Sequence, residues 1–282
     1  MMNDRKKVLV TGANGYLGRH VVQYLSQKNG VEVLALDISK ETTLDCCSYI
    51  GLDVLNSVSE NLYADLNSPD IIIHLAWQDG FNHNSEAHLK NLNAHYNFIK
   101  KMIDAGCASI SIMGTMHEIG YFEGAINENT PCNPMSLYGI AKNALRQATF
   151  AYAENKNVFI KWLRAYYITG DDEKSKSIFG KILGFEKEGK ATFPFTTGEN
   201  KYDFIDVKEL AKQISEASLQ NNINGIINCS SGNPVSLKDK VEEFIKEKNL
   251  KIRPEYGVFP SRKYDSPCVY GDNTLIKEIL GE

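Results

Sequence analysis

Three glycines near the start of the chain limit what the rest can fold into. Gly12, Gly15 and Gly18 follow a short apolar, β-branched segment, 7–10, and precede a segment with apolar residues at helical spacing, 16–25. A buried strand, a glycine turn and a helix form the unit that presents backbone N–H groups and a helix N-terminus to a pyrophosphate. The spacing is GxxGxxG, whereas the commoner dinucleotide fingerprint is GxGxxG.

Each glycine has an expected role in such a turn. Gly12 would allow the tight turn, Gly15 the close approach of phosphate, and Gly18 the close packing of the helix on the strand. The next apolar segment, 31–37, ends in Asp37, nineteen positions after Gly18. A dinucleotide fold places there the carboxylate that binds the adenosine ribose. The alternative is that Asp37 only caps a local turn.

Composition indicates an ordinary soluble protein. The chain has 282 residues, of which 43% are hydrophobic and 23% charged, and its net charge is −4. It has no basic tract, so we expect neither a nucleic acid nor a membrane as its partner. Its six cysteines lack CxxC pairs and metal-ligand spacing, which predicts reduced thiols and no metal site. With no apolar signal region or membrane-length segment, we expect a cytoplasmic location.

Strands and helices alternate along the first part of the chain, which predicts an α/β fold with a doubly wound parallel sheet. The expected strands are 7–10, 31–37, 49–53, 70–76, 108–115 and 158–166, and the expected helices 16–25, 84–105 and 136–154. The later segments are expected to be helices over 175–188, 207–219 and 237–248 and strands over 225–228 and 251–256. We predict a dinucleotide-binding domain over 1–170. Residues 171–282 would form mainly a smaller substrate lobe, with segments near 200–230 returning to the sheet.

Tyr138 and Lys142 form a YxxxK pattern early in the second long helix, 136–154. Positions i and i+4 share a helix face, so the ammonium can lie beside the phenol and lower its pKa from about 10. Such a tyrosine can act as a general acid. Thr115 ends a predicted strand, where parallel sheets bind ligands. The alternative is an ordinary tyrosine, a solvated lysine and a threonine that merely ends its strand.

With these features and the segment His74-Leu-Ala-Trp77, the chain resembles the extended short-chain dehydrogenase/reductases. Within them it resembles the NAD-dependent epimerase/dehydratase family, which acts on nucleotide sugars. Segments 127–134, 164–170, 201–207 and 225–228 are also similar to motifs of that family. Two positions depart from these motifs, since Tyr167 replaces an asparagine and Tyr202 an arginine.

The resemblance implies a role for each matching position. Thr115, Tyr138 and Lys142 would be catalytic. The implied contacts to NAD, with NADP as the alternative, are Gly12, Asn14, Gly15, Tyr16, Leu17, Gly18, Asp37, Asp53, Val54, Leu75, Ala76, Tyr138 and Lys142. The implied contacts to the nucleotide sugar are Trp77, Thr115, His117, Tyr138, Phe193 and Arg262. Arg262 would pair with the diphosphate and Phe193 would stack on the base, and the alternatives are a surface arginine and a core phenylalanine.

The departures narrow the expected reaction. Nucleotide-sugar 4,6-dehydratases carry Asp-Glu after the strand-end threonine, where this chain has Met116 and His117. His117 would orient substrate or pack beneath Tyr121. The chain is short for a 4-epimerase and resembles the 4-keto nucleotide-sugar reductases, among them the dTDP-6-deoxy-L-talose 4-dehydrogenases. That resemblance implies NAD(P)H-dependent reduction of a 4-keto-6-deoxyhexose on a nucleotide carrier.

Two other functions remain open from the sequence. One is a nucleotide-sugar 4-epimerase with tightly bound NAD, and the other is a non-catalytic dinucleotide-binding sensor. The two long helices, 84–105 and 136–154, resemble the pair that forms a dimer interface in the family, which implies a homodimer.

Overall fold

The chain folds around a seven-stranded parallel sheet, which confirms the predicted doubly wound fold. The computed structural model describes residues 5–170, 173, 177–260 and 265–282. The strand order is β11-β7-β5-β4-β1-β2-β3, with every pairing parallel. These strands are β1 (Lys6–Thr11), β2 (Val31–Asp37), β3 (Ser48–Gly51), β4 (Ile71–His74), β5 (Ser109–Thr115), β7 (Phe159–Ala165) and β11 (Gly225–Cys229). The order reverses between β1 and β4, and open sheets of this kind bind ligands at that reversal.

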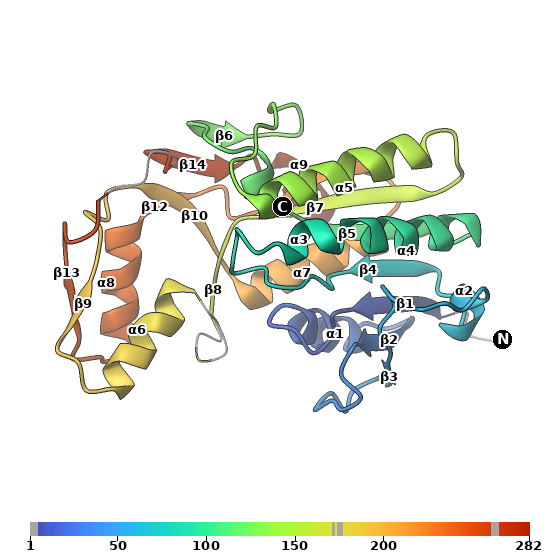
Figure 1. Ribbon diagram of the computed structural model, residues 1–282, viewed down its shortest axis with the longest axis horizontal. Helices are drawn as coiled ribbons and strands as arrows, with labels where there is room; N and C mark the ends of the chain where they lie inside the picture. The colour runs from blue at the N-terminus through green and yellow to red at the C-terminus, as the bar shows by residue number, and fades with distance from the viewer. Residues whose placement is uncertain (1–4, 171–172, 174–176, 261–264) are drawn as a thin grey trace.

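Helices cover both faces of this sheet (Figure 1). One face carries α1 (Gly18–Ser26), α7 (Val207–Leu219) and α9 (Thr274–Leu280). The other carries α2 (Leu62–Asp65), α3 (Ala87–Lys90), α4 (Leu92–Asp104) and α5 (Leu137–Ala153). Alternate residues of β1 supply the two cores: Val8 and Val10 face the first group of helices and Leu9 the second. Burial on both faces is the reason that the strands are continuous apolar runs in the sequence.

The single helix expected over 84–105 is in fact two, α3 and α4. The Ser85 hydroxyl donates to Asp79 at 2.7 Å and accepts from the Ala87 N–H at 3.3 Å, so the helix starts only after it. The interruption follows at Asn91, whose side chain donates to Gln78 at 2.9 Å. A short polar side chain that bonds locally, as that of Ser85 does, competes with helix hydrogen bonds, and periodicity alone does not reveal this.

Short strands form a smaller lobe at one end of the main sheet (Figure 1). Four of them pair in the order β12-β10-β14-β6, β8 pairs with β10, and β13 pairs with β9. The elements are β6 (Gly124–Ile126), β8 (Tyr167–Thr169), α6 (Ile178–Lys187), β9 (Thr192–Pro194), β10 (Lys201–Asp206), β12 (Pro234–Ser236), α8 (Leu237–Glu247), β13 (Arg253–Glu255) and β14 (Cys268–Gly271). Phe179, Tyr202 and Phe244 belong to its core.

The chain passes between the two parts several times. β6 precedes residue 170 but lies in the smaller sheet, whereas β11, α7 and α9 follow it and pack with the main sheet. Sequence patterns did not predict β6, β8, β9, β10, β12 or β14. Five of these strands have only three or four residues, show little alternation and pair with distant segments. In the six-residue β10 the buried Asp203 interrupts the apolar pattern. Across the described residues, no helix combines the length and apolar character needed to cross a bilayer.

Lys161 in β7 is buried among neutral acceptors, with none of its surface exposed. Its Nζ donates to Ser109 Oγ at 3.0 Å, to the Ser218 carbonyl at 3.2 Å and to Asn221 Oδ1 at 3.3 Å. Burial and, to a smaller extent, the positive charge of Lys6 lower its pKa from 10.5 to about 8. The folded protein therefore binds this proton less tightly than the unfolded chain does.

We expect Lys161→Met to change how stability depends on pH. Below about pH 8, Lys161 is protonated in both the folded and the unfolded protein, so the folded state bears the full cost of burying the charge. Between about pH 8 and pH 10, Lys161 is protonated only in the unfolded protein. Stability should therefore rise with pH in the wild type, by up to about 3 kcal/mol relative to Lys161→Met. Urea unfolding at pH 7 and pH 10 measures this, with the exposed Lys246→Met as control. An equal difference at both pH values would contradict the lowered pKa.

Candidate active site

The glycine turn is packed too tightly for a side chain at two of its three glycines. Gly12 has a φ of 71°, and a Cβ there would lie 2.7 Å from the Ala76 nitrogen. A Cβ at Gly18 would lie 2.1 Å from the Gly12 oxygen, so Gly18 brings α1 onto the turn itself and not onto the strand. Gly15 is exposed and leaves the outer face of the turn open. This cradle at the start of a helix fits a pyrophosphate.

Asp37 lies at the end of β2, against the glycine turn. Its Oδ2 accepts from the Asn14 backbone N–H at 3.0 Å, and its Oδ1 accepts from the Ser39 N–H at 3.3 Å. The carboxylate therefore caps a local turn, as one interpretation of the sequence held, and also contacts the predicted cofactor site. Each carboxylate oxygen has a second lone pair, so both can still accept from a ribose hydroxyl.

Four more of the predicted cofactor residues lie near the same edge of the sheet. Backbone N–H groups of Leu75 and Ala76 donate to Thr11, at 3.2 Å to its carbonyl and 3.3 Å to its hydroxyl. The Tyr16 hydroxyl donates to the Gly170 carbonyl. Leu17 directly precedes α1 and packs against the first core.

Two further predicted cofactor residues follow β3. Asp53 accepts from the Leu55 N–H at 3.1 Å and from the Asn56 side chain at 2.7 Å, which shapes the loop. Val54 is 5% exposed and packs in the second core. β3 is the outermost strand on the β2 side, which is the adenosine side of a dinucleotide fold.

The structure brings Thr115, Tyr138 and Lys142 together. Thr115 ends β5, and the other two lie in the first turns of α5. The Tyr138 side chain is hydrogen-bonded with Thr115. The Lys142 Nζ donates to the Met113 carbonyl at 2.7 Å and lies 6.0 Å from the centroid of the Tyr138 ring. This arrangement supplies a proton donor, a hydroxyl that orients it and a neighbouring cation.

A serine cap and a glycine determine where α5 begins. The Ser136 hydroxyl accepts from the Gly139 N–H at 3.2 Å, which satisfies one free donor at the helix start. A Cβ at Gly139 would lie 2.2 Å from the His117 oxygen, so only glycine lets the helix approach this closely. Tyr138 directly precedes Gly139, and this close contact brings it next to Thr115.

Burial dominates the electrostatics of the pair. It raises the pKa of Tyr138 above its ordinary 10.0, and the hydrogen bond with Thr115 opposes this rise. Burial also lowers the pKa of Lys142 from 10.5 to about 7, and the negative charge of Glu118 opposes this fall. We predicted from the sequence that Lys142 lowers the pKa of Tyr138. In the structure Thr115 is the neighbour that lowers it, and burial outweighs the effect.

Trp77, a predicted substrate contact, lies beneath Lys142. The Lys142 Nζ lies 3.8 Å from a ring centroid of Trp77, a cation–π contact that no sequence pattern indicated. The indole stacks on His95 at 4.4 Å and donates to His88 Nδ1 at 3.0 Å. Both histidines are buried, and the sequence did not predict their contacts with Trp77. The spacing of residues in a helix does not show which side chain a histidine contacts.

His117 lies beside Tyr138, together with a histidine that the sequence did not indicate. The ring of His83 stacks on Tyr138 with centroids 5.4 Å apart, and the His117 ring lies 4.2 Å from His83 and 6.1 Å from Tyr138. Its ring contacts are thus with these residues and Tyr167, and Tyr121 is not its partner. Burial lowers the pKa of His117 to about 3, and the neighbouring His83 adds to this. The imidazole is therefore neutral at pH 7.

The two remaining predicted substrate contacts are Phe193 and Arg262, and the structure describes only the first. Phe193 is 8% exposed and packs in the core of the lobe, with ring centroids 4.9 Å from Phe185 and 6.3 Å from Phe195. This is the environment of a core side chain and not of an open stacking surface. Arg262 lies outside the described residues.

Comparison with known proteins gives one family and a near full-length relative. The profile of the NAD dependent epimerase/dehydratase family matches residues 8–231. A dTDP-6-deoxy-L-talose 4-dehydrogenase (NAD(+)) of Aggregatibacter actinomycetemcomitans is 48% identical over 268 residues, which cover 94% of this chain and 98% of that protein. A GDP-6-deoxy-D-talose 4-dehydrogenase of the same organism is 21% identical over 281 residues, which cover 98% and 91%.

Solved structures show the same fold. A UDP-glucuronic acid 4-epimerase from Bacillus cereus, in complex with UDP-glucuronic acid and NAD, superposes with a TM-score of 0.81. The match covers 98% of this chain and 93% of that one at 20% identity. At this identity the likeness establishes the architecture alone.

We expect Asp37→Asn to weaken the preference for NADH over NADPH by roughly tenfold, which corresponds to about 1.4 kcal/mol. The carboxylate would repel a 2′-phosphate and accept from a 2′-hydroxyl, whereas the amide keeps the shape and loses the repulsion. The ratio of kcat/KM for the two coenzymes measures the effect. Asp65→Asn, an exposed carboxylate on α2, is the control and should leave the ratio unchanged. An unaltered ratio in Asp37→Asn would place its carboxylate away from the ribose.

Proposed function

We propose, from the premise that this chain belongs to the NAD-dependent epimerase/dehydratase family, that it reduces a 4-keto-6-deoxyhexose on a nucleotide carrier. The family profile covers residues 8–231, and the 48% identical relative covers nearly the whole chain, so the resemblance stated from sequence motifs is confirmed. NAD is accordingly its cofactor. The specific reaction that we propose is the reduction of dTDP-4-dehydro-L-rhamnose to dTDP-6-deoxy-L-talose by NADH.

The observation that carries the proposal is the convergence of Thr115, Tyr138 and Lys142 in a chain so similar to a nucleotide-sugar 4-dehydrogenase. The glycine turn would hold the pyrophosphate of NADH and Asp37 its adenosine ribose. Bound NADH supplies the hydride for sugar carbon 4. The chain itself must then supply a proton to the ketone oxygen and a surface that orients the sugar.

Tyr138 is the proposed proton donor. Its hydroxyl would give a proton to the carbonyl oxygen as the ketone becomes an alcohol, which leaves a phenolate. The hydrogen bond with Thr115 orients that hydroxyl, and Thr115 would also bond the sugar oxygen. Lys142 is 2% exposed, and its positive charge would stabilise the phenolate more strongly there than in water.

The other two functions suggested by the sequence have weaker support. A non-catalytic sensor would not need a buried tyrosine, Tyr138, that is hydrogen-bonded with Thr115 and lies beside Lys142. A 4-epimerase carries a cofactor that is oxidised and reduced in place. NAD that remains bound through purification would favour the epimerase, and cofactor-free protein that turns over added NADH would favour the reductase.

We further propose a cytoplasmic homodimer. All six cysteines are free thiols, which fits a reducing compartment. α4 and α5 pack side by side, and the family resemblance points to this pair as the dimer contact. Leu89 and Ile140, on α3 and α5, are 47% and 42% exposed. Light scattering of the purified protein tests the dimer, and a monomer at all concentrations would refute it.

The reaction itself is tested with NADH and a panel of 4-keto-6-deoxy nucleotide sugars. We expect NADH oxidation with formation of a carbon-4 alcohol, and no 4-keto-6-deoxy product from dTDP-glucose and NAD. Dehydration needs an acid and a base beside Thr115; Met116 has no proton to transfer, and His117 is neutral at pH 7. A dehydrated product would overturn the reductase assignment.

Tyr138→Phe should lower turnover by about 10² to 10⁴, since loss of a general acid typically costs that much. The affinity for NADH should stay within about twofold, because the hydroxyl acts mainly in the transition state. Tyr121→Phe, an exposed tyrosine bonded to Glu123, is the matched control. Turnover close to that of the wild type in Tyr138→Phe would remove this residue from the mechanism.

A further inference from the structure

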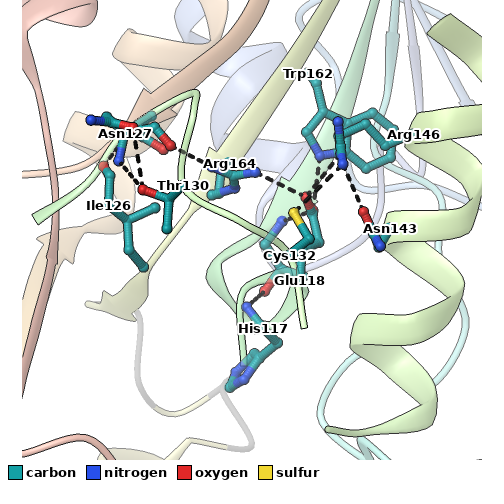
Figure 2. Close-up of polar contacts among 12 residues, drawn as sticks. His117, Glu118, Ile126, Asn127, Thr130, Cys132, Asn143, Arg146, Trp162 and Arg164 are labelled. Carbon is teal, nitrogen blue, oxygen red and sulfur yellow. Dashed lines mark hydrogen bonds and ion pairs between the residues drawn. The ribbon is translucent and has the colours of Figure 1, made fainter. Parts of the chain in front are cut away.

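Glu118 is a fully buried carboxylate that contacts Trp162, Arg146 and Arg164 (Figure 2). Its Oε1 accepts from the Thr115 backbone N–H at 2.7 Å and from the Trp162 indole N–H at 2.8 Å. Its Oε2 faces two cations, Arg164 Nη2 at 3.4 Å and Arg146 Nε at 3.8 Å. Four groups from three segments of the chain, β5, α5 and β7, thus converge on a side chain that no sequence motif indicated.

The first contact restrains Thr115 in two ways. Residues 116–118 form a short 3₁₀ turn, and Thr115 and Glu118 cap its start reciprocally. The Thr115 hydroxyl accepts from the His117 N–H at 3.3 Å, while Glu118 accepts from the Thr115 N–H. Backbone and side chain of Thr115 are both held, and its hydroxyl is left hydrogen-bonded with Tyr138.

The contact with Arg146 connects this turn to the helix that carries the tyrosine. Tyr138, Lys142 and Arg146 are spaced four residues apart and share one face of α5. Arg146 is the member of this row that reaches Glu118, and its guanidinium also donates to Asn143 at 2.7 Å. Glu118 therefore links the end of β5 to the same helix face that presents Tyr138.

The contact with Arg164 connects the segment that leads into α5. Arg164 lies in β7, is fully buried, and donates from Nη1 to the Asn127 carbonyl at 3.3 Å. Asn127 is bonded in turn to Thr130 through its backbone N–H and its side chain. The approach to α5 and the end of β5 are thus held by one guanidinium and one carboxylate.

The packing here leaves little freedom to rearrange. A Cβ at Gly114 would lie 2.2 Å from Trp162 Nε1 and 2.9 Å from Glu118 Oε1. A buried ion pair adds little stability compared with an apolar core of the same volume. The Glu118 carboxylate is better suited to holding backbone groups in a fixed geometry, because charge-assisted hydrogen bonds are short and directional.

We propose that Glu118 is a positioning residue, which holds Thr115 at hydrogen-bond distance from Tyr138 by tying the end of β5 to α5. The kinetic test of this inference rests on the proposed reductase function. Glu118 does not touch the sugar; its effect on turnover passes through Thr115. Removal of its charge should therefore matter only while the Thr115 hydroxyl is present.

Glu118→Gln is the direct test, because glutamine keeps the shape and can still accept from the Thr115 N–H. We expect kcat to fall about tenfold, with KM for NADH and for the sugar nucleotide within about twofold. In a Thr115→Ala background the same substitution should cost less than about twofold, since residues that act as a unit are non-additive. Equal losses in both backgrounds, or no loss at all, would overturn the proposal.

Two further variants keep the test decisive. Glu123→Gln changes an exposed carboxylate in the same loop and should leave kcat unchanged. Arg146→Gln, whose native side chain is 14% exposed, removes the link from Glu118 to α5 and leaves the Glu118 contact with Thr115 in place. It tests the link if Glu118→Gln does not fold. It should lower kcat by about threefold, again only when Thr115 is present. A loss that persists in Thr115→Ala would count against the link.

A measurement without substrate separates this inference from the proposed function. Amide hydrogen exchange at Thr115 should be roughly tenfold faster in Glu118→Gln, while exchange at Leu9 in β1 stays the same. Unchanged exchange at Thr115 would overturn the role of Glu118 whatever the reaction is. Wild-type protein that reduces no 4-keto sugar would refute the proposed function, and the exchange result would still decide the role of Glu118.

Discussion

The close contact between the Gly12 backbone and the Ala76 backbone is the constraint on which the site depends. No Cβ fits at Gly12, and the Thr11 hydroxyl next to it accepts from the Ala76 N–H. This contact joins β1 to β4, the two strands between which the sheet order reverses. The connections leave these strands toward opposite faces, so the space between them is where a ligand can enter. Every residue of the proposed mechanism lies along this edge of the sheet.

The sequence predicted the main sheet well because both of its faces are buried. Continuous apolar segments then identify strands directly, as in β1, β2 and β5. The positions of Thr115 at a strand end and of Tyr138 and Lys142 on one helix could be predicted for a similar reason, since a strand end and an i, i+4 pair are local patterns. The glycine turn is local as well, and its steric requirements appear in the structure at Gly12 and Gly18.

What the sequence did not predict depends on contacts between distant segments. His83 stacks on a tyrosine fifty-five positions away, and Glu118 pairs with arginines from α5 and β7. The short strands of the lobe exist only because they pair across such distances, as β14 does with β6. The balance of charge at Tyr138 was missed because burial, which decides its pKa, is a property of the packed molecule.

Lys142 shows how neutral groups can hold a buried charge at this site. Its ammonium is held by the Met113 carbonyl and the face of Trp77, while Glu118 acts on it from further away. Glu118 pairs directly with two arginines and not with Lys142. Its negative charge still favours the charged form of Lys142, without forming an ion pair that would occupy the ammonium. The ammonium thus keeps donors for a ribose hydroxyl and for the phenolate of Tyr138.

The buried histidines complete this balance by remaining neutral. His74 Nδ1 is bonded to the Thr11 hydroxyl at 2.8 Å, and its Nε2 to His95 Nδ1 at 2.9 Å. Burial lowers the pKa of both, that of His74 to about 3, and the positive charge of Lys142 lowers both further. A proton on either ring would repel the ammonium and displace it from Trp77. The chain from Thr11 to His95 therefore connects the dinucleotide turn to the catalytic lysine through groups that carry no charge at pH 7, which leaves the charge of Lys142 available to Tyr138.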